Sequence, residues 1–398
     1  MKILVLNARI YSLEYELLEM PEEKILCSGK VSRIGAVHSI IYHKNPEGKE
    51  EKFVLTVYDH KDAIEKILTI LISEKIIKTK KDIDAVGHRV VHGGEDFKES
   101  VRINSGVRKK IHRNIELAPL HNPYNLKAIN AAVKVFSKVP NVAVFDTSFY
   151  QKMPAHAYYY AVPMHLYQKY RVRRYGFHGI SHQYACESAV RMLKKSIKEL
   201  KIISFHIDEG CSATAIKDGA PVDTSMGFSP LSGLVMMRRC GNVDPEIVIY
   251  LSKLGWNITE IETLLNKKSG VCGISGIGEI QEVVEFAKKG DKRANLALDV
   301  FCYSIQKYLF LYYGVLRGAN VIIFSGDIGI NVPYIREKVL KGTEFLGIKL
   351  DTVKNNKVIG TQGRIDAKGS KVKILIVPRN EGILIARETY AKCRKGQK

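Results

Sequence analysis

Residues 142–182 combine side chains that suit recognition of an anionic substrate. An apolar run at 142–145 predicts a buried strand, and Asp146 follows it directly. Ligands of α/β folds bind at the carboxyl ends of strands, where Asp146 would lie. A carboxylate there and a glycine-flanked His/Arg loop suit anionic substrates, whereas a strand end followed by a solvated basic loop is the alternative explanation. The loop residues concerned are Arg173, Arg174, Gly176, His178, Gly179 and His182.

Elements that could position these side chains recur along the chain. Apolar periodicity predicts helices over residues 61–77, 122–136, 183–199 and 292–316. The alternation of such helices with strands predicts an α/β fold. The strand-like runs, each leading into a polar or glycine-containing turn, are residues 2–7, 85–94, 142–146, 201–206, 320–329 and 373–382.

A weak internal repeat links the two halves of the chain. Residues 3–19 and 202–218 share an apolar strand, a polar residue at its end, a short turn with serine and a second strand. With 398 residues, the chain is long enough for two domains.

The formal net charge of +21 favours anionic partners such as nucleotides or acyl phosphates. The lysines are scattered, and only short stretches such as 108–110 and the C-terminal 392–398 cluster, which indicates a solvated basic surface. No nucleic-acid recognition motif is present, which argues against a nucleic-acid partner.

The seven cysteines include no CxxC pair, which predicts reduced thiols. The N-terminal apolar run is too short for a signal peptide, and the apolar region at 296–316 is interrupted by Asp299, Gln306 and Lys307. We therefore expect a buried helix there rather than a membrane span, and a soluble cytoplasmic protein.

Further sequence motifs are spread over almost the whole chain. Together with 142–182 they resemble the acetate kinase family in order and spacing, nearly end to end. The blocks are residues 3–7, 87–97, 117–129, 221–234, 238–245, 269–277, 335–351 and 377–390.

The resemblance implies two similar α/β domains of the actin, sugar-kinase and heat-shock ATPase superfamily, with a cleft between them. Residues 1–150, joined by about 383–398, would form an N-terminal acyl kinase domain, and 151–382 a C-terminal nucleotide-binding domain. The implied activity is phosphoryl transfer between ATP and acetate, or another short carboxylate, giving acetyl phosphate. Mg²⁺ would be required, with Mn²⁺ as an alternative. A homodimer is implied, and a membrane partner is not.

Phosphoryl transfer is catalysed mainly by positioning and by neutralising negative charge. By resemblance, Asp146, His178 and Arg239 are catalytic. We assign Asp146 to the metal shell, because a carboxylate acceptor is already ionised at neutral pH. The resemblance makes Arg89 and His121 substrate-binding residues. It also implies a small apolar pocket, suited to acetate or propionate, formed by Val91, Leu120, Phe177 and Pro230.

The metal and nucleotide positions also come from the resemblance. Asn7 and Glu381 match the positions linked to Mg²⁺, which prefers oxygen ligands. The positions matching the cofactor-binding loops are Ser12, His206, Asp208, Glu209, Gly210, Gly326, Asp327, Gly329 and Asn331.

Four nucleotide-side blocks depart from the family pattern. The first loop, usually N-x-G-S-S-S-L-K, retains Ser12 but has Glu14 in place of lysine. Asp208 and Glu209 replace glycine and asparagine in the second loop. Residues 278–282 lack the D-x-R adenosine element, and Ile330 replaces the glutamate of the G-x-G-E-N turn.

These departures leave three hypotheses open. The first is an ATP-dependent carboxylate kinase with a modified nucleotide site. The second is a carboxylate kinase or acyl phosphatase that uses another phosphoryl carrier, such as pyrophosphate. The third is a non-catalytic family member that binds an acyl phosphate or a protein partner.

Overall fold

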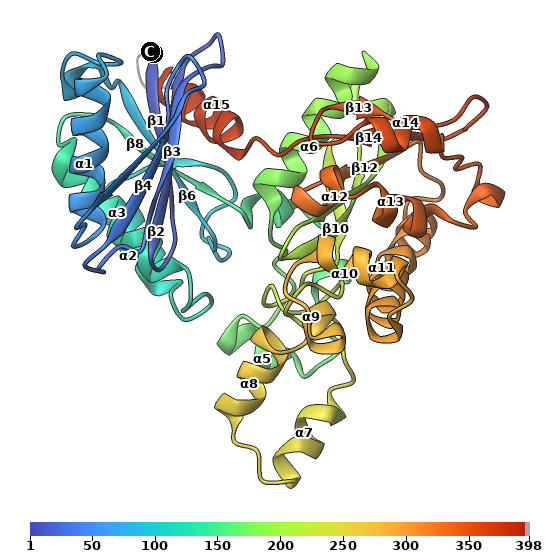
Figure 1. Ribbon diagram of the computed structural model, residues 1–398. Helices are drawn as coiled ribbons and strands as arrows, with labels where there is room; N and C mark the ends of the chain where they lie inside the picture. The colour runs from blue at the N-terminus through green and yellow to red at the C-terminus, as the bar shows by residue number, and fades with distance from the viewer. Residues whose placement is uncertain (395–398) are drawn as a thin grey trace. The chain divides into compact units, whose positions relative to one another are not determined.

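The computed structural model describes residues 1–394 and divides into two compact units (Figure 1). Unit 1 comprises Met1–Gln151 and the chain from Asn380 onward, and unit 2 comprises Lys152–Arg379. Each unit contains one β-sheet with helices packed against it, which confirms the predicted α/β class.

Unit 1 is built on an eight-stranded sheet in the order β5-β4-β3-β2-β1-β6-β8-β7. Its strands are β1 (Lys2–Ala8), β2 (Ser12–Glu19), β3 (Lys24–Ser32), β4 (Ser39–Lys44), β5 (Glu50–Leu55), β6 (Ala85–Val90), β7 (Val101–Arg102) and β8 (Asn141–Phe145). Its helices are α1 (His60–Ser73), α2 (Ser105–Arg113), α3 (Asn122–Val135) and α15 (Glu381–Arg394), with a 3-10 turn at Lys80–Asp82.

Alternation along the strands gives this sheet two different faces. Leu4 and Leu6 of β1 join the core beneath α1 and α3. On the other face, α15 contacts β6, β1 and β8 (Figure 1). Gly87 makes this second contact close: a Cβ there would lie 2.5 Å from Oγ1 of Thr389 and 2.8 Å from Cγ2 of Ile385. The C-terminal helix is therefore fitted onto the sheet of unit 1.

Unit 2 has a six-stranded sheet in the order β11-β10-β9-β12-β14-β13. Its strands are β9 (Lys201–Ile207), β10 (Cys211–Lys217), β11 (Ala220–Thr224), β12 (Val321–Ser325), β13 (Gly363–Arg364) and β14 (Lys373–Ile376). Its helices are α4 (Ala155–Tyr158), α5 (Met164–Tyr170), α6 (Gly179–Leu193), α7 (Glu246–Lys253), α8 (Ile258–Lys267), α9 (Gly270–Ser275), α10 (Ile280–Lys288), α11 (Lys292–Val315), α12 (Asp327–Asn331), α13 (Pro333–Leu340) and α14 (Thr352–Lys357). Two 3-10 turns of unit 2 lie at Ile197–Glu199 and Glu344–Leu346, and a third, Ser148–Lys152, spans the point where the chain passes from unit 1 to unit 2.

The two sheets share one strand plan. In unit 1, β1 pairs antiparallel with β2 and parallel with β6, and β6 pairs parallel with β8. In unit 2, β9 pairs antiparallel with β10 and parallel with β12, and β12 pairs parallel with β14. The weak repeat in the sequence corresponds to the two antiparallel pairs. Parallel neighbours place their carboxyl ends along one edge of each sheet, where ligands of such folds bind.

The elements begin and end differently from the sequence prediction at several points. The runs 85–94, 320–329 and 373–382 continue as strand only to Val90, Ser325 and Ile376. The residues beyond them turn at glycine or proline, and these turns carry the polar side chains discussed below. The helix expected at 183–199 begins at Gly179 and ends at Leu193.

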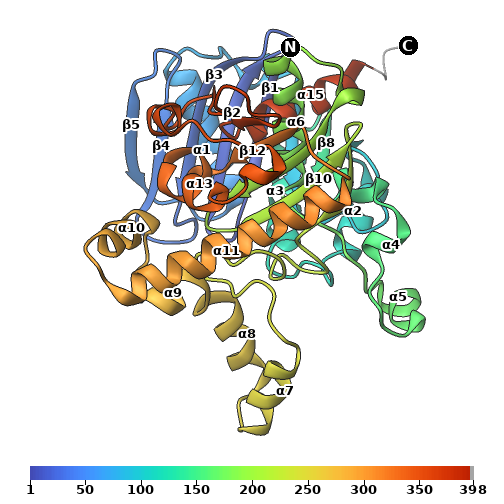
Figure 2. The same cartoon turned by 90° about the vertical axis from the view of Figure 1, so that its right-hand side faces the viewer.

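The long helix α11 is buried on one face only. Phe301 and Ile305 are fully buried, whereas Leu296 and Tyr303 are exposed, so the helix is less buried than the sequence suggested. No helix among the described residues is long and apolar enough to span a membrane. Figures 1 and 2 show α7 and α8 of unit 2 projecting away from its sheet.

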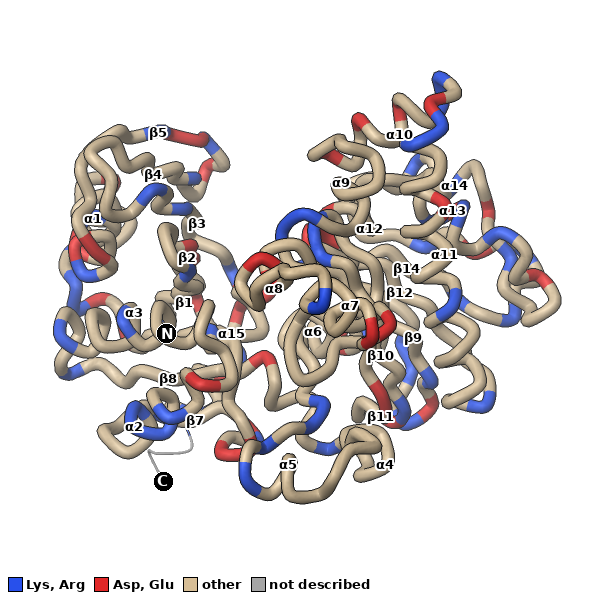
Figure 3. The backbone as a smooth tube through the Cα atoms, turned by 90° about the horizontal axis from the view of Figure 1, so that it is seen from below, with Lys and Arg blue, Asp and Glu red and all other residues tan. Residues whose placement is uncertain are grey.

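The basic residues are distributed over both units. Figure 3 shows Lys and Arg positions scattered along the backbone of both units, with Asp and Glu positions among them. All seven cysteines are free, as predicted.

Candidate functional site

In unit 1, strand alternation brings three polar residues to the sheet face that α15 covers. Asn7 of β1 and Arg89 of β6 lie on the face opposite Leu6 and the α1–α3 core. Glu14 of β2 is the direct cross-strand partner of Asn7. The helix α15 begins on this face at Glu381.

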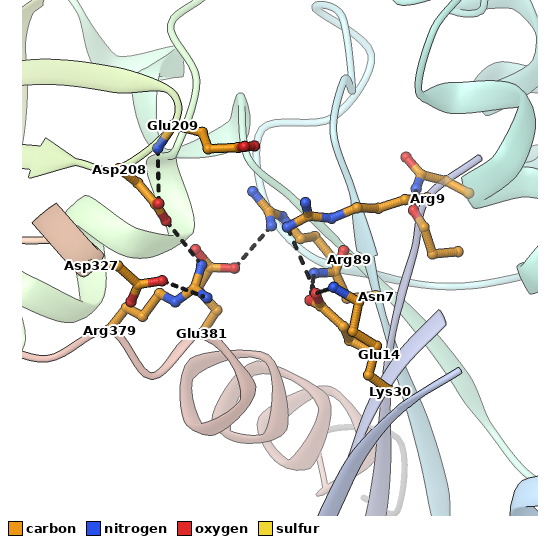
Figure 4. Close-up of polar contacts among 12 residues, drawn as sticks. Asn7, Arg9, Glu14, Lys30, Arg89, Asp208, Glu209, Asp327, Arg379 and Glu381 are labelled. Atoms are coloured by element: carbon orange, nitrogen blue, oxygen red, sulfur yellow. Dashed lines mark hydrogen bonds and ion pairs between the residues drawn. The ribbon is translucent and has the colours of Figure 1, made fainter. Parts of the chain in front are cut away.

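Arg89 is held by two carboxylates in this group. Its Nη2 and Nε donate to Oδ2 of Asp146 at 2.7 and 3.2 Å. Its Nη1 donates to Oε2 of Glu381 at 2.9 Å (Figure 4). The Arg89 side chain is only 11% exposed. Burial alone would lower the pKa of Arg89, but Asp146 and Glu381 outweigh it and raise that pKa. The guanidinium therefore stays charged and has a fixed orientation.

Glu14 lies in a more favourable environment than the sequence suggested. Its Oε2 accepts a hydrogen bond from Nδ2 of Asn7 at 2.9 Å, and its Oε1 lies 3.5 Å from Nζ of Lys30 and 3.9 Å from Nη2 of Arg9 (Figure 4). The side chain of Glu14 is 31% exposed and therefore in contact with solvent. The two cations and the solvent reduce the cost of the charge inversion.

Lys30 was missed in the sequence analysis. It lies on β3 directly opposite Glu14, and pairs of opposite charge stabilise neighbouring strands. A register shift between Leu17 and Leu18 displaces this pairing, so no sequence signal marks Lys30 as the partner of Glu14.

The chemistry of this face fits a magnesium ion held by few protein ligands. Asn7 and Glu381 both carry the hard oxygen donors that Mg²⁺ prefers. Among residues 1–394, no three acidic, histidine or cysteine side chains cluster closely enough to enclose a metal ion. Magnesium sites of nucleotide-using enzymes have this character, because waters and substrate phosphates complete the coordination.

In unit 2, a histidine and an arginine meet over a glycine. His178 precedes α6 with φ of +56°, a left-handed conformation that few residues other than glycine adopt. A Cβ on Gly210 would lie 3.4 Å from Cε1 of His178 and 3.3 Å from Nη1 of Arg239. Gly210 therefore lets the two side chains approach the loop after β9, as a site for a small anionic group requires.

Arg239 has no carboxylate partner within ion-pair distance in the described chain. Its Nη1 donates to the carbonyl oxygen of Pro230 at 3.3 Å and lies 3.8 Å from Sδ of Met236. Burial lowers the pKa of Arg239, while Cys211 and Glu209 oppose that shift. Its charge is therefore less neutralised than that of Arg89.

His178 belongs to a chain of hydrogen bonds that the sequence analysis did not recognise. Oγ of Ser212 lies 2.9 Å from Nδ1 of His178 and 2.8 Å from Nε2 of His182. Nδ1 of His182 in turn lies 2.8 Å from Oγ of Ser204. Burial, with a smaller contribution from His206, lowers the pKa of His182 well below its usual value. A neutral His182 thus anchors Ser212, which fixes the ring of His178.

The carboxyl ends of β9, β12 and β14 form a second polar group in unit 2. Asp208, Asp327 and Arg379 follow these strands, and Arg379 pairs with both aspartates (Figure 4). Gly326 permits the tight turn after β12, because a Cβ there would lie 2.5 Å from the carbonyl oxygen of Ile207.

A cavity of about 450 Å³ lies at the far end of α12. Asn331 is the last residue of that helix and contributes to the lining, together with residues of α10 and α13. Gln281, Val284, Lys288, Val332 and Tyr334 supply both polar and apolar surface.

Comparison with known proteins gives a consistent result. Residues 2–387 match the model of the Acetokinase family. The chain is 49% identical to the acetate kinase of Acetivibrio thermocellus and 47% identical to that of Thermotoga maritima, covering 98% of both chains in each case.

Among solved structures, the acetate kinase of Porphyromonas gingivalis superimposes with a TM-score of 0.94 at 41% identity, covering 98% of this chain and 99% of that one. A propionate kinase from Francisella tularensis gives 0.91 at 37% identity with the same coverage.

The chain belongs to the acetokinase family. Its fold is therefore the predicted one of the actin, sugar-kinase and heat-shock ATPase superfamily.

The remaining predicted acyl-side residues lie in different environments. In unit 1, Val91 is half-buried, Leu120 is exposed, and His121 directly precedes α3. In unit 2, Phe177 is buried and Pro230 is half-buried beside Arg239. Their joint role as an acyl pocket stays a prediction.

The remaining predicted nucleotide-side residues occupy loops or helix ends. The carbonyl oxygen of Ser12 accepts from the Arg9 N–H at 2.8 Å and closes the turn before β2. His206 stacks obliquely on His178 with 4.7 Å between ring centroids. Glu209 is exposed, and its N–H donates to Oδ1 of Asp208 at 2.8 Å. Gly329 is buried within α12.

Proposed function

We propose that this chain transfers a phosphoryl group between ATP and acetate, forming acetyl phosphate and ADP. The observation that carries the proposal is the charged network around Arg89, in which Asp146 and Glu381 hold a buried guanidinium in one orientation. Near full-length membership of the acetokinase family supports the same reaction.

The proposed reaction needs no protein base. A carboxylate oxygen of acetate forms a bond to the γ-phosphorus, and the bond from that phosphorus to the β,γ-bridging oxygen breaks, so ADP leaves. Because the acceptor is already an anion, the protein must reduce the repulsion between two negative groups. We assign that task to Arg89, Arg239 and His178, whose donors suit phosphoryl and carboxylate oxygens.

In this scheme Asp146 would contribute by holding Arg89 in position. It fixes the Arg89 guanidinium with two hydrogen bonds to a single oxygen, and it contributes to the shell around the metal. Mg²⁺, or Mn²⁺ in its place, would supply charge neutralisation on the phosphates when bound. Asn7 and Glu381 would hold it, and the resident hydrogen bonds keep both side chains in place.

The cavity beside Asn331 supports ATP over pyrophosphate as the donor. A volume of about 450 Å³ lies within the usual range for small-ligand pockets, and pyrophosphate has no group that would fill it. We propose that the nucleoside binds there, with Tyr334 and Val284 against the base. The D-x-R element absent from residues 278–282 would then be replaced by this mixed lining.

The decisive experiment measures acetyl phosphate, trapped as hydroxamate, from purified protein with acetate and Mg²⁺. ATP, GTP and pyrophosphate are supplied in parallel. We expect turnover with ATP and none with pyrophosphate. Acetyl phosphate formed with pyrophosphate but not with ATP would contradict the proposal. The absence of acetyl phosphate with every donor at saturating concentration would contradict it as well. Propionate in place of acetate tests the acyl range, for which one methylene changes binding by only about 1–3 kcal/mol.

We further propose a homodimer acting in the cytoplasm. Exposed apolar side chains on α7 and α8 support self-association, because such patches mark interaction surfaces. Light scattering should then give twice the chain mass of 44.8 kDa. The residues concerned are Ile247, Ile249, Tyr250, Leu254, Trp256 and Ile258.

A further inference from the structure

Three adjacent parallel strands of unit 2 each deliver one charged residue at the carboxyl end. Asp208 follows β9, Asp327 follows β12 and Arg379 follows β14. The strands β9, β12 and β14 are neighbours in that order. The sheet topology therefore brings together three residues that are far apart in the sequence.

Arg379 connects the other two. Its Nη1 donates to Oδ2 of Asp208 at 3.2 Å, and its Nη2 lies 3.5 Å from Oδ2 of Asp327 (Figure 4). The second oxygen of Asp208 accepts the N–H of Glu209, so this carboxylate is fixed from both sides. The guanidinium is thereby held over the strand ends.

Arg379 nevertheless stays accessible. Its side chain is 40% exposed, compared with 11% for Arg89. A guanidinium presents five N–H donors in a planar fork, so the exposed part of this side chain suits contact with the oxygens of an anion. An arginine that only stabilised the fold would gain little here, because partly exposed ion pairs contribute about 0–1 kcal/mol.

The chain also needs a cation for phosphate binding. The first loop has Glu14 where the family pattern has lysine, and the second loop has gained Asp208 and Glu209. A polyphosphate requires positive charge or backbone N–H groups around it. Within unit 2, the strand ends at which nucleotide phosphates bind in such folds carry one arginine, Arg379.

We propose that Arg379 contacts the phosphate oxygens of the phosphoryl donor, and that Asp208 and Asp327 are positioning residues that hold its guanidinium for this contact. This inference rests on the proposed function, because it assigns a specificity-determining residue to the same donor. Arg379 with two aspartates carries a net charge of −1, so the group repels a free polyphosphate. The donor therefore binds as its magnesium complex.

The test compares Arg379→Gln and Arg379→Lys with the wild type. Loss of charge-assisted hydrogen bonds should raise KM for Mg-ATP about 10- to 100-fold in Arg379→Gln, with KM for acetate unchanged within twofold. Arg379→Lys keeps the charge but not the fork, so its KM for Mg-ATP should lie between the two. Calorimetric titration of Mg-ATP should give the same ranking of Kd.

Arg364→Gln is the matched control. Like Arg379, Arg364 is a partly exposed arginine of unit 2 that pairs with an aspartate, Asp366. Unlike Arg379, it lies on β13, at the edge of the sheet. The Arg364→Gln variant should have a KM for Mg-ATP within twofold of the wild-type value. Melting temperatures of all variants separate misfolding from weak binding.

A second arm tests the positioning residues. Asp327→Asn removes one negative charge and should narrow the difference in Kd between Mg-ATP and metal-free ATP at least threefold. If Arg379→Gln and Arg379→Lys both bind Mg-ATP within twofold of wild type, the inference is overturned. It is equally overturned if the wild type does not bind Mg-ATP. Mg-ATP binding that depends on Arg379, without acetyl phosphate formation, would leave the inference standing while the proposed function failed.

Discussion

The two units hold Arg89 and Arg239 in opposite ways. Arg89 of unit 1 forms ion pairs with two carboxylates, Asp146 and Glu381. Arg239 of unit 2 is held by a carbonyl oxygen and a thioether sulfur, and no ion pair to it occurs within the described chain.

The difference separates two jobs that cations do in phosphoryl transfer. A buried guanidinium such as that of Arg89, neutralised by two carboxylates, is fixed in position and attracts a further anion weakly. Arg379 also pairs with two carboxylates, but its side chain is 40% exposed, compared with 11% for Arg89. A guanidinium held by neutral acceptors keeps more of its charge for an incoming anion, at the cost of burial without compensation. We therefore assign orientation mainly to Arg89 and stabilisation of transferring negative charge mainly to Arg239.

Replacing Arg89 with glutamine should break the first half of this comparison. The substitution leaves Asp146 and Glu381 buried without their cation, so the free energy of unfolding should fall by about 3–5 kcal/mol. Urea denaturation at neutral pH measures it. Arg113→Gln, which removes the ion pair between Asp96 and an arginine that is itself 60% exposed, is the control and should cost less than about 1 kcal/mol. Equal effects would mean that Arg89 is not a structural clamp.

Arg239→Gln should behave in the opposite way. Because no buried carboxylate loses its partner, the free energy of unfolding should change by less than about 1 kcal/mol. The value of kcat should fall about 100- to 1,000-fold, as when one stabilising donor is removed from a transition state. Steady-state kinetics with ATP and acetate measure this. A stability loss as large as that of Arg89→Gln would erase the contrast.

His88, the neighbour of Arg89 on β6, makes the stability of unit 1 depend on pH. His88 is fully buried without an acid partner, and burial lowers its pKa to about 4, although Nε2 donates to Oδ1 of Asn141 at 2.8 Å. The unfolded chain, with a pKa near 6.5, therefore binds more protons than the folded one between these values. Stability should fall as pH decreases through this window, by about 2 kcal/mol at pH 5.

His88→Gln provides the matching variant. Glutamine retains a donor for Asn141 but does not titrate, so the slope of unfolding free energy against pH between 6.5 and 5 should decrease. Denaturation midpoints at four pH values give that slope. An unchanged slope would assign the pH dependence to other groups, such as His182.

The sequence predicted the parts of the site that depend on strand periodicity. Arg89 and Asp146 were correctly placed on or after strands because apolar runs identify β6 and β8. Lys30 was missed because a register shift between Leu17 and Leu18 changes the pairing of β2 with β3. Such a bulge is not visible in residue types, so the partner of Glu14 could not be counted from the hairpin.

Arg379 was missed for a related reason. The pattern at 373–382 predicts a strand that leads into a turn, and the strand ends already at Ile376, with Pro378 close behind it. Proline has no N–H for the ladder, and the chain turns there. The contact of Arg379 with Asp208 is a long-range one, which local pattern cannot show.

The contrast between Arg89 and Arg239 also concerns His178, which lies beside Arg239 and is held by a hydrogen bond to Ser212. Ser212→Ala removes the hydroxyl that fixes the imidazole ring of His178 beside Arg239. The value of kcat should therefore fall about tenfold, with little change in KM. Ser204→Ala is the control, because Ser204 contacts only His182 in this chain of hydrogen bonds. The pH profile of kcat should shift for Ser212→Ala and not for Ser204→Ala. Identical profiles would reduce Ser212 to a packing role.

The smallest effect concerns Glu14, whose charge departs from the family pattern. Glu14→Lys alone should not restore a working cation, because the new lysine would face Lys30 across the strands and lie near Arg9. Facing like charges cost about 0.2–1 kcal/mol, and the new side chain would be pushed from its place.

The exchange Glu14→Lys with Lys30→Glu keeps the ion pair and moves the positive charge to position 14. If the missing lysine limits nucleotide binding, KM for Mg-ATP should fall a few-fold in the double variant and stay unchanged in Glu14→Lys. A lower KM already in the single variant would show that Lys30 does not oppose the new charge. No change in either would mean that the cation for phosphate comes from elsewhere in the chain, as the position of Arg379 predicts.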